Sequence, residues 1–182
     1  MKTTIKSIIE WVCRLYVFFF LNFYGLGKIA GMQFYRRGKL PAEVAQLTLE
    51  TADAYSLAWT FMGYSFSYIL FVGSLQVLGA WLLLWNRTKF FGVFILIPIL
   101  VNIIVFDLIF LDQKGAVVNA SLYLLMLITI VYCNQEVFVS CLNLLTRKRN
   151  LKPFTPKRLL ALAFAIILVF LLDQSLVTLV GH

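Results

Sequence analysis

The sequence contains very little histidine and cysteine. Its only histidine is His182, and its three cysteines are Cys13, Cys133 and Cys141, with no Cys-x-x-Cys pair among them. Zinc sites, haem ligation and Ser-His-Asp triads depend on histidine or on clustered cysteine. An odd cysteine count also argues against a disulfide framework. We therefore expect no metal site and no intrinsic redox cofactor.

Charged residues are also scarce. They make up 13% of the 182 residues, whereas 62% of the residues are hydrophobic. A soluble domain has about a quarter of its residues charged, so this composition argues against an ordinary soluble enzyme and against a disordered chain. The net charge is +8, but the basic residues flank apolar stretches, as the positive-inside rule describes for membrane proteins. We therefore expect membrane lipids as partners and no nucleic acid.

Five apolar stretches are long enough to form helices that cross a membrane, which takes about 20 residues. The first stretch contains charged residues that a cleaved signal peptide lacks, so we expect it to remain as an anchor. The sequence thus predicts an all-α integral membrane bundle with spans near 8–30, 64–85, 90–111, 116–135 and 159–180.

The distribution of lysine and arginine predicts the orientation. With the N-terminus in the cytoplasm, ten of these residues fall in cytoplasmic segments and four in outer segments, which the positive-inside rule favours. The predicted location is the bacterial inner membrane, with the C-terminus extracytoplasmic. A basic loop, which would touch anionic headgroups or dock a cytoplasmic partner, contributes most of this bias: Arg147, Lys148, Arg149, Lys152, Lys157 and Arg158.

The segment 32–63 is expected to lie outside the membrane. Pro41 followed by Glu43 is typical of a helix start, and it predicts a short surface helix near 41–52. The aromatic residues that follow fit a belt at the membrane interface: Trp59, Tyr64 and Tyr68.

Several polar residues fall at membrane depth, where an ionisable group needs a partner. Glu10 and Arg14 are four residues apart and predict an ion pair on one helix face. Lys28 returns to that face, although Arg14 and Lys28 could instead extend to opposite interfaces. Lys28 and Asp107 fall at similar depth, and we expect them within salt-bridge reach. The residues expected to form a ligand-binding or structural polar site are Lys28, Gln33, Gln76, Asn102, Asp107, Asn119 and Asp173.

The second span has a face of small and polar residues, formed by Gly73, Gln76 and Ala80. Small residues let another helix approach, and the amide can then bond across the contact. This pattern favours helix packing, with a ligand contact at Gln76 as the alternative.

Three stretches together resemble DoxX-like membrane proteins. Residues 23–34, with Gly25 and Lys28 in a Gly-x-x-Lys arrangement, are similar to the family's first helix, and residues 59–84 and 87–107 are similar to its second and third helices. The resemblance covers about residues 10–133 as a pattern of spans. It implies a four-helix transmembrane core in residues 1–135, a basic cytoplasmic linker in 136–158 and an additional transmembrane helix in 159–182. Residues 136–145 could also extend the fourth helix.

The resemblance implies an accessory or anchor subunit of a quinone-linked redox system, with an oxidoreductase as partner. The quinone would contact Lys28, Gln33, Gln76 and Asp107, although the family often has glutamate at the position of Gln76. A small ion-coupled transporter and a non-catalytic assembly or effector protein remain as alternatives. A homo-oligomer would supply the helices that so short a transporter lacks.

Overall fold

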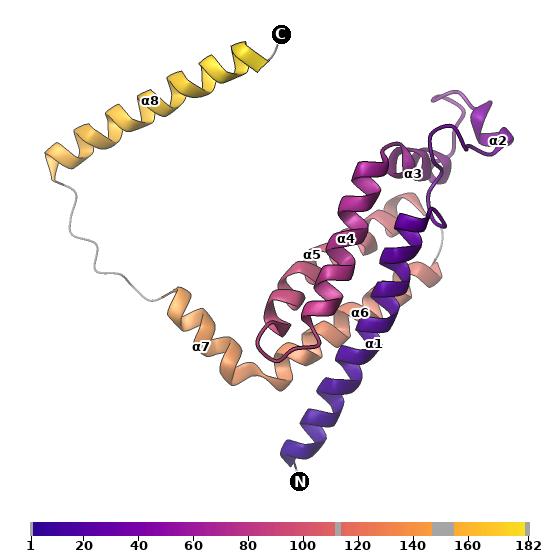
Figure 1. The fold of residues 1–182 in the computed structure, drawn as a ribbon, viewed down its shortest axis with the longest axis horizontal. Coiled ribbons are helices and arrows are strands. Elements are labelled where there is room, and N and C mark those ends of the chain that lie inside the picture. The colour runs from indigo at the N-terminus through magenta and orange to yellow at the C-terminus, as the bar shows by residue number, and fades with distance from the viewer. Residues whose placement is uncertain (1, 112–113, 147–154, 181–182) are drawn as a thin grey trace. The chain divides into compact units, whose positions relative to one another are not determined.

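The computed structural model describes residues 2–111, 114–146 and 155–180, and every regular element in this part of the chain is a helix (Figure 1). The chain divides into two compact units, Met1–Ser140 and Cys141–His182. The helices are α1 (Lys2–Ala30), α2 (Ala42–Ala45), α3 (Ala54–Gly63), α4 (Phe66–Leu82), α5 (Lys89–Phe110), α6 (Lys114–Cys133), α7 (Gln135–Leu145) and α8 (Pro156–Val180).

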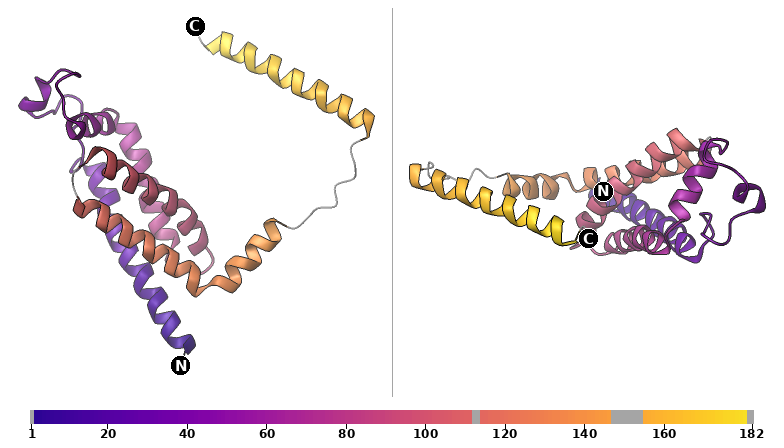
Figure 2. Two further views of the ribbon diagram at one scale, coloured as in Figure 1. Left: turned by 180° about the vertical axis from the view of Figure 1, so that it is seen from behind. Right: turned by 90° about the horizontal axis from the view of Figure 1, so that it is seen from above.

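Four long helices form a ring in the first unit. α1 packs against α4 and α6, and α5 completes the ring by packing against the same two helices (Figure 2). α3 contacts α4 and α5 at one end of this bundle. The centre of the ring is filled by aliphatic side chains that are each at most 1% exposed, among them Val17, Leu21, Leu96, Leu127 and Ile130.

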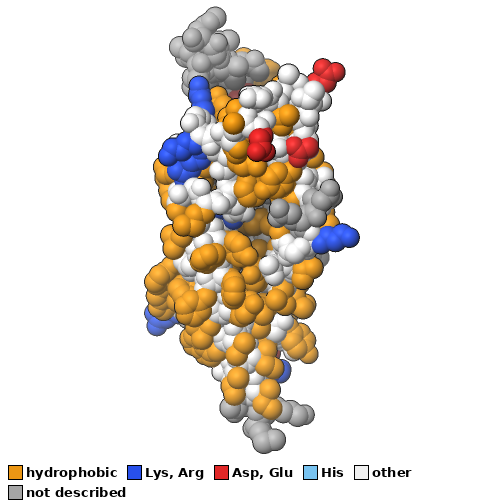
Figure 3. Space-filling model, turned by 90° about the vertical axis from the view of Figure 1, so that its right-hand side faces the viewer, with side chains coloured by type: hydrophobic (Ala, Val, Ile, Leu, Met, Phe, Trp, Pro, Cys, Tyr) orange, Lys and Arg blue, Asp and Glu red, His pale blue; other side chains and the backbone are white. Residues whose placement is uncertain are grey.

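The outside of the bundle is also apolar. In the described residues, three segments are long and apolar enough to cross a membrane: Ile5–Ala30, Lys89–Phe110 and Lys114–Cys133. α3 and α4 taken together are also long and apolar enough, although the two helices are bent by 88° relative to each other. Figure 3 shows hydrophobic side chains over most of the visible face. The predicted all-helical bundle with several candidate spans is confirmed, whereas a membrane crossing by α8 stays a prediction.

The segment before α4 differs from the predicted surface helix near 41–52. α2 has only four residues, and the chain then turns at Thr48 and Thr51, whose hydroxyls lie 2.9 Å apart. Asp53 starts α3 by accepting a hydrogen bond from the Ser56 amide at 3.3 Å, which is a helix N-cap. A hydrogen bond from the Ser56 side chain, together with this one from the amide, lowers the pKa of the Asp53 carboxyl. Local capping therefore places a second helix, α3, after the predicted surface helix and inside the same outer segment 32–63.

Asn134 separates α6 from α7. Its side-chain amide donates to the Ile130 carbonyl at 2.9 Å, and its side-chain oxygen accepts from Lys89 at 2.5 Å. Residues 136–145 therefore belong to a separate helix rather than to an extension of α6, and the first part of the expected linker is helical. Phe138 of α7 lies against the rings of Phe90 and Phe94 in α5.

The basic loop is described only in part. Lys157 and Arg158 are exposed in the first turn of α8. The other four basic residues of this loop lie outside the described residues: Arg147, Lys148, Arg149 and Lys152.

Two glycines of α1 provide a matched test of the contact between α1 and α4. A Cβ at Gly25 would lie 2.8 Å from the Val77 side chain and 3.0 Å from the Gly73 carbonyl oxygen, whereas a Cβ at Gly27 would meet nothing within 4 Å. Gly25→Ala is expected to destabilise the bundle by about 1–3 kcal/mol through overpacking. Gly27→Ala is expected to be neutral or to stabilise it by up to about 1 kcal/mol, because alanine favours helix. Unfolding in mixed micelles measures both, and equal effects would contradict this account of the contact.

Candidate functional site

Arg14 is the centre of a polar network at the end of the bundle where α1 begins. It is 1% exposed, and its guanidinium donates to the Leu83 carbonyl at 2.5 Å and to the Leu84 carbonyl at 2.6 Å. It also donates to the side-chain oxygen of Asn86 at 2.7 Å. Carbonyls just after a helix lack partners within the helix. Arg14 supplies the hydrogen-bond donors for these carbonyls, and it thereby ties α1 to the turn between α4 and α5.

Glu10 joins this network to α5 and, through Lys89, to Asn134 between α6 and α7. Its carboxylate accepts from Arg14 at 3.3 Å, so the ion pair expected from the sequence is present, and it accepts from Lys89 at 2.7 Å. Lys89 was expected in a loop, but it is 8% exposed and also donates to Asn134. Arg14 is thus buried within the bundle, with its partners on α1 and on the turn between α4 and α5. With its polar groups paired, this network is a structural clamp.

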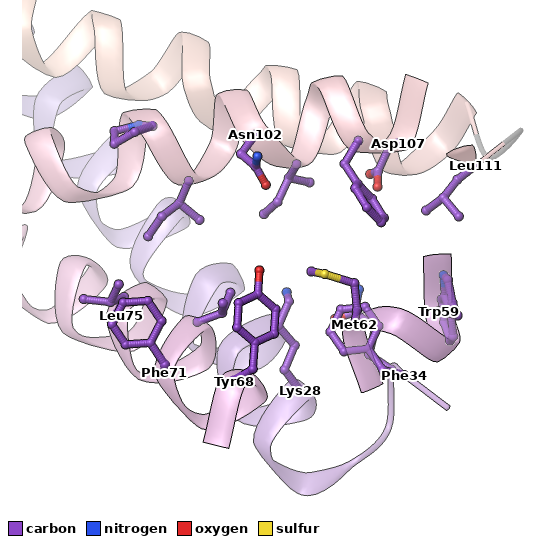
Figure 4. Close-up of a pocket in the computed structure, with 16 residues that line it drawn as sticks. Lys28, Phe34, Trp59, Met62, Tyr68, Phe71, Leu75, Asn102, Asp107 and Leu111 are labelled. Atoms are coloured by element: carbon purple, nitrogen blue, oxygen red, sulfur yellow. The ribbon is translucent and has the colours of Figure 1, made fainter. Parts of the chain in front are cut away.

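A cavity of about 280 Å³ lies at the other end of the bundle, between α4 and α5 (Figure 4). Near their connecting turn these helices touch closely, because a Cβ at Gly92 would lie 2.7 Å from the Gly79 carbonyl oxygen. Farther along, larger side chains face each other across the cavity, and α3 contributes Trp59 and Met62 to its wall. A tight contact between small residues at one end thus leaves space at the other.

The cavity wall is mainly apolar and aromatic, with a few polar groups. Figure 4 shows Lys28, Tyr68, Asn102 and Asp107 directed into the space between the helices. Tyr68 is 43% exposed and Phe71 is 60% exposed on the flank of the bundle. Part of the cavity wall therefore lies on the outer surface of the bundle, on the side that would face hydrocarbon. Its aromatic lining residues are Phe34, Trp59, Tyr68, Phe71 and Phe106.

A second cavity of about 70 Å³ lies inside the helical ring. Four residues line both cavities, namely Lys28, Gln33, Ile103 and Asp107, so the two spaces adjoin. The polar residues that line the smaller cavity alone are Tyr24, Gln76, Asn119 and Tyr123.

Lys28 and Asp107 lie at these cavities without touching. Lys28 is 5% exposed and Asp107 is 7% exposed, and their charges attract each other. Among the described residues, however, salt bridges join Glu10 to Arg14 and to Lys89 only. The expected direct salt bridge between Lys28 and Asp107 is therefore wrong.

The ring of helices explains why Lys28 has a different partner. Its ammonium donates to the Gln76 side chain at 3.1 Å. α1 and α4 are neighbours, held close by Gly25 and Gly73, whereas Asp107 lies on α5, which is diagonal to α1. Gln76 thus takes part in both helix packing and the polar site, which the sequence left as alternatives.

Six of the seven polar residues expected from the sequence come together around the two cavities. Asp173 is exposed on α8 in the second unit, and its membership of the site stays a prediction. Sequence reasoning missed the cavity roles of Trp59 and Tyr68, which were interpreted only as interface residues. Within the described part of the chain, no three His, Cys, Asp or Glu side chains are grouped to hold a metal ion.

Comparisons with known proteins give one informative relative. No family model matches the sequence, and no solved structure matches the chain. The uncharacterized protein YwoB of Bacillus subtilis strain 168 is 30% identical over 139 residues, which cover 76% of this chain and 85% of YwoB. At this identity and coverage, the chain belongs to the same protein family as YwoB.

Proposed function

We propose that this chain is an accessory or anchor subunit of a quinone-linked redox system in the bacterial inner membrane. The observation that carries the proposal is the lateral cavity between α4 and α5, which combines an aromatic wall with buried Lys28 and Asp107. The sequence resemblance to DoxX-like proteins supports the same proposal. The orientation proposed from the basic residues, with a cytoplasmic N-terminus, places this cavity in the outer half of the membrane.

The lining of the cavity suits a quinone ring. Small-molecule pockets combine apolar and aromatic walls with a few placed polar groups, and they measure about 300–1,000 Å³. At about 280 Å³, this cavity has room for one ring, while an isoprenoid tail would remain in the lipid. Lys28 can donate to one ring oxygen, and Tyr68 and Asn102 lie across the cavity from each other, where the other ring oxygen would be.

In this proposal the chain binds and orients the ring. A quinone supplies two-electron, two-proton chemistry when bound, and an oxidoreductase partner would exchange electrons with it. Lys28 holds a ring oxygen, while the aromatic wall excludes water from the ring. The helical bundle anchors the partner to the bilayer.

Ion-coupled transport is the second candidate, and Asp107 is the observation that favours it. Asp107 is 7% exposed as a residue, and no described residue donates a hydrogen bond to its carboxylate. Intramembrane carboxylates commonly mark ion pathways. Against this function, Lys28 lines both of the same cavities and would repel a cation.

Quinone binding is tested by the fluorescence of Trp59, whose side chain lines the cavity. A decyl-substituted benzoquinone added to the purified full-length chain is expected to give a saturable quench, most of which is lost in Trp59→Phe although three other tryptophans remain. Lys28→Met is expected to weaken binding by roughly tenfold or more, because hydrogen bonds from charged groups are strong.

The control is Lys39→Met, because Lys39 is exposed and lines neither of these cavities. It is expected to bind the quinone like the unmodified chain. Quenching that does not saturate, or that survives unchanged in Trp59→Phe, would overturn the proposed function. In that case, proton or cation flux into liposomes that is lost in Asp107→Asn would favour the transporter.

A further inference from the structure

Lys28 and Asp107 frame the junction of the two cavities, and the residues that the structure describes leave the hydrogen-bonding capacity of both unfilled. An ammonium group has three donors, and Lys28 uses one of them toward Gln76. Asp107 is an acceptor to which no described residue donates, and it is 93% buried because its exposure is 7%. A molecule between them therefore meets donors on one side and a bare acceptor on the other.

The two oxidation states of a quinone ring differ in what they offer at this point. A quinol hydroxyl can accept a hydrogen bond from Lys28 and donate its own proton to Asp107. A quinone carbonyl can only accept, so it satisfies Lys28 and leaves the carboxylate facing another oxygen lone pair. A buried charged group without its hydrogen bond carries the full cost of its desolvation.

We infer that the Lys28–Asp107 pair makes the cavity selective for the quinol over the quinone. This inference rests on the proposed function, because it requires a quinone-type ring in the cavity. The expected preference is roughly tenfold to a hundredfold in affinity, the range that one hydrogen bond to a charged group supplies. The chain would then be a binding subunit for the reduced carrier, the form from which a partner enzyme takes electrons.

The polar side chains described around these cavities do not supply the missing donor to Asp107. Lys28 is held toward Gln76, and Gln33 lines both cavities without a hydrogen bond to Asp107 in the described part of the chain. The discrimination therefore depends on Asp107. Lys28 should contribute equally to the affinity for the quinol and for the quinone, because it donates to a hydroxyl oxygen and to a carbonyl oxygen alike.

The test compares one ring in its two states. Decyl-substituted benzoquinone and its quinol, prepared with dithionite under anaerobic conditions, are titrated calorimetrically into the full-length chain in detergent. The unmodified chain is expected to bind the quinol at least tenfold more tightly. Asp107→Asn is expected to bring the ratio close to one, because an amide can donate to a carbonyl and accept from a hydroxyl.

Lys28→Met is the matched variant. It is expected to weaken the binding of both the quinone and the quinol while preserving the ratio of the two affinities. Saturable binding of both forms with equal affinity to the unmodified chain would overturn this inference and leave the proposed function standing. A preference that survives in Asp107→Asn would also overturn it. If neither form binds, the proposed function fails together with the inference.

Discussion

Replacing Arg14 with alanine is expected to lower the free energy of unfolding by about 3–5 kcal/mol, the range seen when one partner of a buried charge network is removed. The guanidinium is 1% exposed, and its loss leaves the carbonyls of Leu83 and Leu84 without the donors that tie α1 to the turn after α4. The measurement is unfolding in mixed micelles, monitored by helical circular dichroism.

Arg14→Lys separates the charge from the geometry. Lysine keeps the positive charge but lacks the planar set of donors that reaches several acceptors at once, so we expect a loss of about 1–3 kcal/mol. Lys39→Ala, at an exposed position, is the control and should change stability by no more than about 0.5 kcal/mol. If Arg14→Ala behaved like this control, the network would not be a clamp.

Lys28 and Asp107 are expected to stabilise each other across the cavity even though they form no salt bridge. Lys28→Met leaves Asp107 buried without a countercharge, and Asp107→Asn does the reverse. Each single change is therefore expected to destabilise the bundle. The double variant is expected to be more stable than the sum of the two losses predicts, by about 1–3 kcal/mol, when measured by the same micelle titration.

A second cycle provides the control for this coupling. This cycle combines Lys28→Met with Glu43→Gln, a change at an exposed carboxylate in α2. The effects of the two substitutions on the free energy of unfolding should add within about 0.5 kcal/mol. Additive losses for Lys28→Met and Asp107→Asn would show that the two charges are independent.

Long apolar runs were enough to predict the main helices. In a helix, the backbone N–H and C=O groups of such a run form hydrogen bonds with each other. The run can therefore be helical whichever segments pack against it. The predicted spans near 8–30, 90–111 and 116–135 accordingly match α1, α5 and α6 within a few residues, apart from an earlier start of α1. Segments outside the long apolar runs were predicted less well. The course of residues 41–63 depends on single side chains, such as the Asp53 cap, rather than on a repeating pattern.

The composition of the site was also predictable, because a polar side chain in an apolar span must face the bundle or water. That reasoning selected Lys28, Gln76 and Asp107, which are all buried. The spacing along one helix likewise predicted the ion pair between Glu10 and Arg14. The sequence could not identify Lys89 as the third member of that network, because its position at the start of a span is typical of a loop residue.

The sequence by itself determined that the chain forms apolar helices and which polar residues they carry, because both follow from the chemistry of single segments. Only the tertiary structure decided which of those residues meet. Glycine contacts make α1 and α4 neighbours, so Lys28 bonds Gln76 and stays apart from Asp107. The order of helices around the ring is set by the packing of side chains between segments distant in the sequence, and no pattern within one segment contains that information.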